Sequence, residues 1–190
     1  MNRKLPFLAA VVFLAGLVSA PAFPAGPGDQ KAYAGRLGVM TQNLYVGANL
    51  FKLVQPGIPP EDIPLVTAEI FGDIQATDFQ QRAVEIAALV AKKRPHLIGL
   101  QEVSLLRTQC PDDIVLPPNT TEPNATDVYA DYLQILLDAL AAQGLDYEVA
   151  ALVENADVEL PAANLGLVDC PFPLIDVRLT DYDVTLRRSA

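Results

Sequence analysis

The stretch "MTQNLYVGANL", residues 40–50, says more about this chain than any other segment of similar length. Its first residues belong to an apolar run that predicts a strand over residues 36–46, with mostly apolar side chains on both faces. Asn43 then places an amide where such a strand would carry an apolar side chain, and Gly47 lets the chain turn. An amide at the end of a strand can hold a loop together or bind a ligand. Which of these two roles Asn43 has depends on the segments that lie next to it in the fold.

An amphipathic helix follows this strand after a proline-rich connection. The helix is predicted to begin at Thr77, because "TDFQ" fits a capping box in which Thr77 and Gln80 satisfy the first backbone groups. Apolar residues then recur at helical spacing, at Phe79, Ala83, Ile86, Ala87 and Val90. Pro95 prevents the helix from continuing.

The apolar segment "HLIGLQEV" comes directly after this helix and predicts a second strand over residues 97–103. A strand, a helix and a strand in this order predict parallel pairing with a right-handed crossover. Asn43 and Glu102 would then lie near the carboxyl ends of adjacent or near-adjacent strands. Open α/β sheets bind their ligands at that edge.

Helical and strand patterns continue to alternate along the rest of the chain, which predicts the α/β class. The expected elements are a short helix around residues 65–71, a helix from Tyr129 that Gly144 stops, and strands over residues 146–153 and 175–188. A second proline-rich loop precedes the helix at Tyr129. No internal repeat interrupts this order.

The amino-terminal residues 1–22 are predicted to be a secretory signal peptide, because a positive start precedes an apolar run and small residues at the cleavage position. The alternative is an uncleaved membrane anchor, but the run is shorter than the roughly 20 apolar residues that a span needs. Residues 23–35 are then a flexible lead-in, and residues 36–190 form one domain. The chain is expected to be extracellular or periplasmic, with no transmembrane segment after removal of the signal.

The chain has two cysteines, Cys110 and Cys170. In an oxidising compartment an isolated pair favours one disulfide, which would stabilise the fold by roughly 2–4 kcal/mol. Both cysteines lie in proline-rich segments, so the alternative is two loop thiols that never meet.

The net charge of −10 weighs against a broad nucleic-acid-binding face, because phosphate backbones are held by clustered Lys and Arg. The one dense basic cluster, residues 92–94, lies at the predicted end of a helix, where cations complement the helix dipole. A divalent cation could still bring an acidic protein to a phosphate.

Glu102 is a lone carboxylate on an otherwise apolar strand, and burying it is costly unless another group compensates its charge. A magnesium ion would compensate it, since Mg²⁺ accepts one or two carboxylates and keeps several waters. Glu102 and Asn43 could begin such a site. The alternative is that both are solvated or capping residues at strand ends.

The segments "MTQNLYVGANL" and "RPHLIGLQEV", separated by an amphipathic helix, resemble the amino-terminal signature of the endonuclease/exonuclease/phosphatase superfamily, which includes deoxyribonucleases and secreted sphingomyelinases. The resemblance covers residues 36–188. It implies a four-layer α/β/β/α sandwich, with a mixed sheet and covering helices, and hydrolysis of a phosphoester substrate that depends on Mg²⁺ or another divalent cation such as Mn²⁺. It makes Glu102 the metal ligand, assigns Asn43 to the metal or a phosphate oxygen, and leaves Gln101 structural.

The same resemblance implies that part of the catalytic site is missing, because the superfamily activates water with a His/Asp pair from carboxyl-terminal motifs that this chain lacks. The only histidine, His96, is expected to be a surface or capping residue, and Asp181 and Asp183 are expected to be strand and turn residues. The expectation is therefore a secreted metal-dependent phosphoesterase, truncated to its amino-terminal half and inactive in this form. The alternatives are a non-catalytic secreted binding protein with the same half-fold, and an unrelated enzyme for which the sequence shows no motif.

Overall fold

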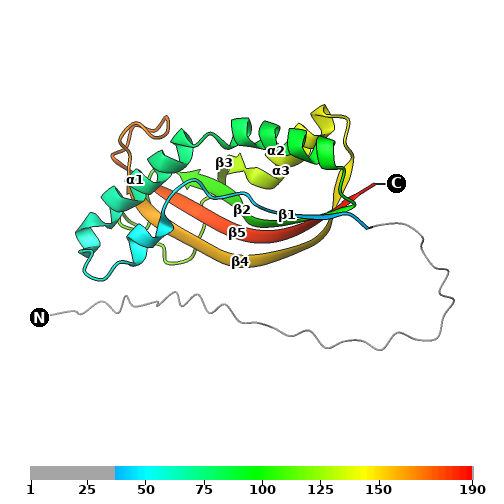
Figure 1. The fold of residues 1–190 in the computed structure, drawn as a ribbon. Helices are drawn as coiled ribbons and strands as arrows, with labels where there is room; N and C mark the ends of the chain where they lie inside the picture. Colours follow the sequence, from blue (N-terminus) through cyan, green and yellow to red (C-terminus); the bar gives the residue numbers. More distant parts are fainter. Residues whose placement is uncertain (1–36, 190) are drawn as a thin grey trace, which may run out of the picture. The chain divides into compact units, whose positions relative to one another are not determined.

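A mixed five-stranded sheet with helices against it is built by residues 37–189, the part of the chain that the computed structural model describes (Figure 1). This confirms the predicted α/β class. The predicted signal peptide and lead-in lie outside the described residues. The strands are β1 Val39–Asn43, β2 Leu97–Gln109, β3 Asp127–Asp131, β4 Tyr147–Ala163 and β5 Leu174–Arg188. The helices are α1 Ile63–Ala76, α2 Phe79–Lys93 and α3 Tyr132–Ala142, with short 3₁₀ turns at Leu50–Val54 and Pro60–Asp62.

The strands are arranged in the order β1-β2-β5-β4, and β3 pairs with the far end of β2. β1 and β2 are parallel, in a register that runs from Val39 opposite Leu97 to Asn43 opposite Gln101. The other pairings are antiparallel. The predicted parallel pairing of the first two strands is therefore confirmed.

The main core lies between the sheet and its helices, which run along one side of the sheet in Figure 1. The apolar stripe predicted for α2 faces this core, with Ala83, Ala87 and Val90 fully buried. On the opposite side of the core, Ile98 and Leu100 of β2 are 1% exposed. The rings of Phe79 and Tyr132 stack between α2 and α3, with centroids 3.7 Å apart.

The boundary between α1 and α2 differs from the capping box expected at Thr77. Asp78 is the amino-terminal cap of α2, and its carboxylate accepts a hydrogen bond from the Gln81 amide. The Thr77 hydroxyl donates instead to the carbonyl of Ile74 at the end of α1. α1 also extends beyond the short helix expected, at both ends. Pro64 is tolerated there because it lies in the first turn, where a missing amide hydrogen costs nothing.

The helix predicted from Tyr129 begins three residues later, because residues 127–131 form β3. Asp131 ends the strand and caps α3, its carboxylate accepting from the Gln134 amide. β2 is likewise longer than predicted and continues past Glu102 to Gln109. Glu102 therefore does not end its strand, although the pairing of β2 with β1 ends beside it.

Cys110 and Cys170 form the predicted disulfide, with Cα atoms 6.1 Å apart. The bridge joins the end of β2 to the loop between β4 and β5. Among the described residues, no helix has the length and apolar character needed to cross a bilayer.

Candidate functional site

Glu102 occupies an irregular position in β2, at a bulge where Gln101 and Glu102 lie between two residues, Leu100 and Val103, that pair with β5. Its backbone φ is 54°, in the left-handed region that glycine favours. For a residue with a side chain this conformation costs about 1–2 kcal/mol. Bulges re-aim side chains and are frequent beside active sites, so this conformation makes Glu102 a candidate functional residue.

Two donors from the segment after β1 fix the carboxylate of Glu102. The Asn43 amide nitrogen donates to Oε1 at 2.8 Å, and the Val46 backbone amide donates to Oε2 at 2.9 Å. The Asn43 amide oxygen in turn accepts from the Tyr45 backbone amide at 2.7 Å. Asn43 therefore both holds the loop and orients Glu102.

Gly47 completes this turn, with a φ of 111° that a residue with a side chain rarely adopts. A Cβ atom at this position would collide with the Thr77 hydroxyl. The glycine therefore lets the loop approach the junction of α1 and α2 while Val46 points its amide at Glu102.

The site retains capacity for a cation. A carboxylate offers about four lone-pair sites, and hydrogen bonds occupy one on each oxygen of Glu102. The Asn43 side chain is exposed and that of Glu102 is partly exposed, so solvent can reach both. Hard oxygen donors of this kind fit Mg²⁺ or Mn²⁺.

Two further acids lie near Glu102, on β5. Burial raises the pKa of Asp181; a hydrogen bond from Asn155 opposes the shift, and the charges of Asp183 and Glu102 reinforce it. Both aspartates lie within β5, so the expected strand position is confirmed and the expected turn is not found there. The electrostatic link of Asp181 to Glu102 depends on the pairing of β2 with β5, which the sequence alone did not indicate.

The only histidine stands apart from these groups. His96 precedes β2, and its Nδ1 accepts a hydrogen bond from the Gly38 amide at 3.0 Å, beside the start of β1. Glu102 lies at the other end of the β1–β2 pairing. The structure thus gives His96 a local structural contact.

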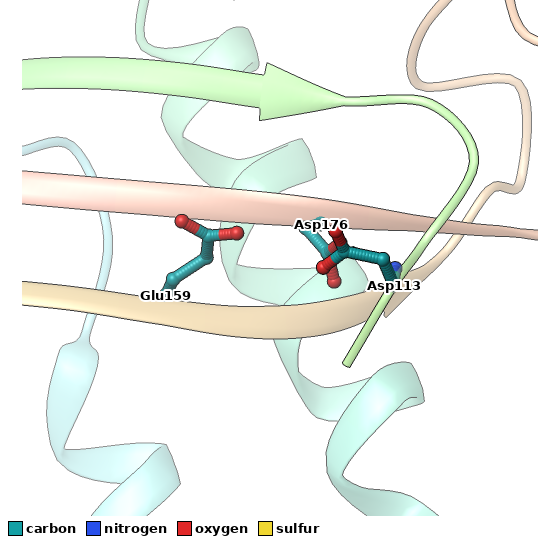
Figure 2. A group of neighbouring side chains, drawn as sticks. All are labelled: Asp113, Glu159 and Asp176. Atoms are coloured by element: carbon teal, nitrogen blue, oxygen red, sulfur yellow. The ribbon is translucent and has the colours of Figure 1, made fainter. Parts of the chain in front are cut away.

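A second group of acids, which the sequence analysis missed, lies on the sheet near the disulfide. Asp113 follows β2, Glu159 lies on β4 and Asp176 on β5, and each offers a carboxylate oxygen within 4.8 Å of the others. Figure 2 shows these side chains in front of the strands, with helices behind them. The three residues come from separate segments with no recognisable spacing.

Hydrogen bonds fasten this acidic group to the loop that follows β2. The Asp113 amide donates to Asp176 Oδ2 at 2.8 Å, and the amides of Asn124 and Ala125 donate to Glu159 Oε2 at 2.7 and 2.9 Å. Burial raises the pKa of Asp176 to about 8, and the neighbouring carboxyl of Asp112 contributes in the same direction. The hydrogen bond from Asn124 lowers the pKa of Asp113.

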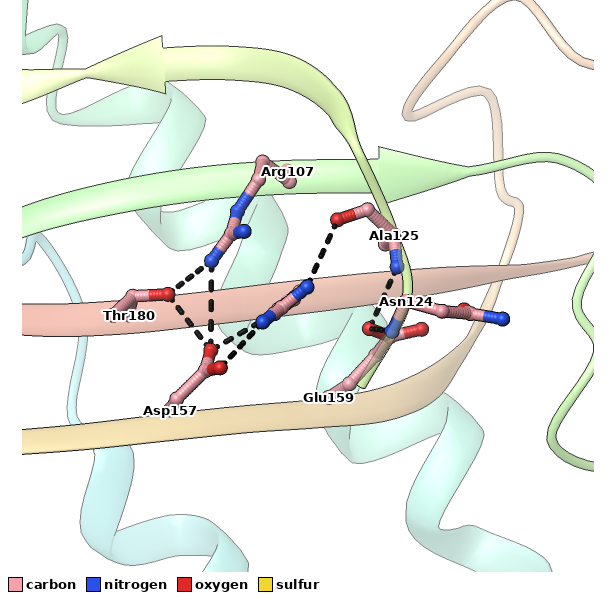
Figure 3. A network of polar contacts seen from close by, with 7 residues as sticks. Arg107, Asn124, Ala125, Asp157, Glu159 and Thr180 are labelled. Carbon is pink, nitrogen blue, oxygen red and sulfur yellow. Dashed lines mark hydrogen bonds and ion pairs between the residues drawn. The ribbon is translucent and has the colours of Figure 1, made fainter. Parts of the chain in front are cut away.

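A network of ion pairs adjoins the acidic group and is shown in Figure 3. Arg178 donates to both oxygens of Asp157, at 2.9 and 2.5 Å, and Arg107 lies 3.5 Å from the same carboxylate. The Thr180 hydroxyl also donates to Asp157. Hydrogen bonding from Arg178 lowers the pKa of Asp157, so this carboxylate is charged and its charge is matched.

Comparisons of the chain with protein-family models, curated proteins and solved structures found no match.

Proposed function

We propose that this chain is a secreted, phosphoester-directed protein of the endonuclease/exonuclease/phosphatase type, with Glu102 as the ligand of a divalent cation. The observation that most supports this proposal is the conformation of Glu102. This residue adopts a left-handed backbone conformation at a bulge, and two donors from the loop after β1 hold its carboxylate. Strained backbone that neighbouring contacts maintain is frequent at functional sites. In the proposed four-layer sandwich, the described sheet and its helices would supply two layers.

The roles of the residues follow from their contacts. Asn43 positions Glu102 through its amide nitrogen, and the Val46 amide fixes the second carboxylate oxygen. Asp181 and Asp183 add negative charge nearby, which favours a cation over an anion at this place. A bound Mg²⁺ or Mn²⁺ ion would stabilise charge on a phosphate oxygen.

Hydrolysis needs a group that activates water, and the one histidine of the chain bonds to Gly38 instead. We therefore propose cation-assisted binding of a phosphoester without turnover by this chain. The acidic surface favours a small phosphoester or a lipid headgroup over long DNA. A secreted binding protein that uses another surface is the alternative.

Paramagnetic broadening by Mn²⁺ tests the proposed ligand directly. In an NMR spectrum of the backbone amides, low Mn²⁺ concentrations should broaden the signals of Tyr45 and Val46 before those of other residues near this site. Excess Mg²⁺ should reverse this broadening. We expect millimolar affinity for Mg²⁺, worth about 4 kcal/mol. Glu102→Gln should abolish the broadening, whereas Glu85→Gln, a matched change on the exposed face of α2, should not. Equal broadening in the wild type and Glu102→Gln would refute the assignment.

An assay with bis-nitrophenyl phosphate separates binding from catalysis. No Mg²⁺-dependent hydrolysis is expected from the wild-type chain. Turnover that disappears in Glu102→Gln would show that the chain supplies its own means of activating water, and would overturn the claim of inactivity.

A further inference from the structure

The loop over residues 110–126 crosses the strands on the side away from the helices, and polar contacts hold it there (Figures 2 and 3). Asp113 and the amides of Asn124 and Ala125 bond to acids on β4 and β5. The disulfide fixes one end of this loop. The contacts therefore gather carboxylates beneath a segment that has no regular structure of its own.

Four buried carboxylate oxygens in this place have no hydrogen-bond partner within the described part of the chain. They are Oδ2 of Asp112, Oδ1 of Asp113, Oε1 of Glu159 and Oδ1 of Asp176. Asp176 is 0% exposed and Asp112 is 1% exposed, so neither side chain is in contact with bulk solvent. Unsatisfied buried polar groups are rare in folded proteins, and each calls for an explanation.

Asp112 lies outside the group of three acids and provides a separate indication that a ligand is bound there. Its Oδ1 accepts from the amides of Val115 and Leu116, which directs the carboxyl group into the interior. Its second oxygen has no N–H donor, and the carboxyl groups of Asp112 and Asp176 lie within hydrogen-bonding reach of each other. Two buried carboxyl groups in contact need either a shared proton or a bound cation between them.

The protein's own cations do not fill that role. Among residues 37–189, no ion pair includes Asp112, Asp113, Glu159 or Asp176. Arg178 is close enough to Glu159 to respond to its charge, but its guanidinium donates to Asp157 and to the carbonyl of Ala125. Without a cation, buried carboxylates this close together would have to take up protons to lower their charge.

We propose that Asp113, Glu159 and Asp176, with Asp112 beside them, form a structural Ca²⁺ site that fastens the loop over residues 110–126 to β4 and β5. Ca²⁺ takes six to eight oxygen ligands in flexible geometry, including carboxylates and backbone carbonyls. Mg²⁺ demands near-ideal octahedral geometry and usually keeps several waters, which a site with several buried carboxylates fits less well. This site is distinct from Glu102 and does not depend on its function.

Thermal unfolding of the full chain, with its disulfide intact, tests the site. We expect Ca²⁺ to bind with a Kd on the order of 10⁻⁴ M, as in extracellular modules. At 10 mM Ca²⁺ the Tm should then rise by about 5 °C or more. An equal rise with Mg²⁺ would overturn the assignment to Ca²⁺. No rise with Ca²⁺ would overturn the site, and would mean that the carboxyl groups share protons instead.

Variants locate the ion. Asp176→Asn should weaken Ca²⁺ binding at least tenfold in calorimetry, and Asp113→Asn, a less buried change, provides the same test if the first variant does not fold. Asp169→Asn, an exposed change in the loop between β4 and β5, should bind as the wild type does. Glu102→Gln should also keep the Ca²⁺ response, which separates this site from the proposed phosphoester site. Undiminished binding in both Asp113→Asn and Asp176→Asn would place the ion elsewhere and refute the proposal.

Discussion

The left-handed backbone conformation of Glu102 is unfavourable for any residue with a side chain. Its carboxylate, however, is the acceptor for two hydrogen-bond donors. These two features have opposite effects on stability, and single substitutions can separate them. Removing the carboxylate leaves the Val46 amide and the Asn43 amide nitrogen without their acceptor. Removing the Cβ atom as well relieves the left-handed strain.

We therefore expect Glu102→Ala to lower the free energy of unfolding by about 1–2 kcal/mol, and Glu102→Gly to lower it by about 1 kcal/mol less. Urea unfolding of both variants measures the difference. At Glu85, inside α2, the order should reverse, because glycine is less stable than alanine in a helix by about 1 kcal/mol. If Glu102→Gly proved less stable than Glu102→Ala, the result would argue against strain at this residue.

Tyr132 provides a pH-dependent prediction at the same scale. Its buried hydroxyl donates to the Val46 carbonyl at 2.8 Å, and burial raises its pKa to about 12. The unfolded chain releases this proton near pH 10, so the unfolded state is favoured progressively as pH rises from about 10 to 12. Stability from the neutral phenol is present below pH 10 and is lost above it.

Tyr132→Phe should accordingly be less stable than the wild type by about 1 kcal/mol at pH 7 and should lose less stability above pH 10. Urea midpoints between pH 7 and 11 test this, with Tyr129→Phe on the exposed side of β3 as the matched control. An identical alkaline slope in the wild type and Tyr132→Phe would contradict the prediction.

At the scale of elements, hydrophobic periodicity and helix-breaking residues predicted the α/β class and the parallel pairing of the first two strands. The stripe on α2, the apolar character of β1 and β2 and the order of the two strands were sufficient for the parallel pairing. The exact ends were not, because local signals compete. Thr77 and Asp78 both suit a cap; in the structure Asp78 caps α2, whereas the Thr77 hydroxyl donates to a carbonyl at the end of α1.

The candidate sites show the same division. Asn43 and Glu102 could be paired from the sequence because strand order alone brings them together. The acidic group could not, since its members depend on the register of β4 with β5 and on the path of the loop after Cys110. The spacing of residues within one segment does not show which residues of a distant strand will lie opposite them.

At the scale of the whole molecule, β4 is a strand of 17 residues that pairs, within residues 37–189, with β5 alone and so lies at the edge of the described sheet. Its exposed apolar residues include Val153 at 59% and Leu152 at 47%. Long edge strands with apolar side chains offer unpaired backbone groups to other chains.

We expect the chain to self-associate in a concentration-dependent way, and Val153→Lys to weaken that association. Sedimentation velocity over a range of concentrations measures it. Val84→Lys, an equally exposed position on α2, should leave the association unchanged. A sedimentation coefficient that does not vary with concentration in the wild type would show that β4 is not adhesive.

Val46 has a consequence for spectroscopy, because its two backbone polar groups face different structures. Its amide donates to the Glu102 carboxylate, and its carbonyl accepts from Tyr132, whose ring stacks on Phe79 in the core. The chain contains no tryptophan, so tyrosine dominates its emission. A ligand that moves the Glu102 carboxylate would also move Val46. This would alter the hydrogen bond between the Val46 carbonyl and the Tyr132 hydroxyl, and with it the fluorescence of Tyr132. Occupancy of an exposed site could thus be followed optically through a buried ring, without any attached dye.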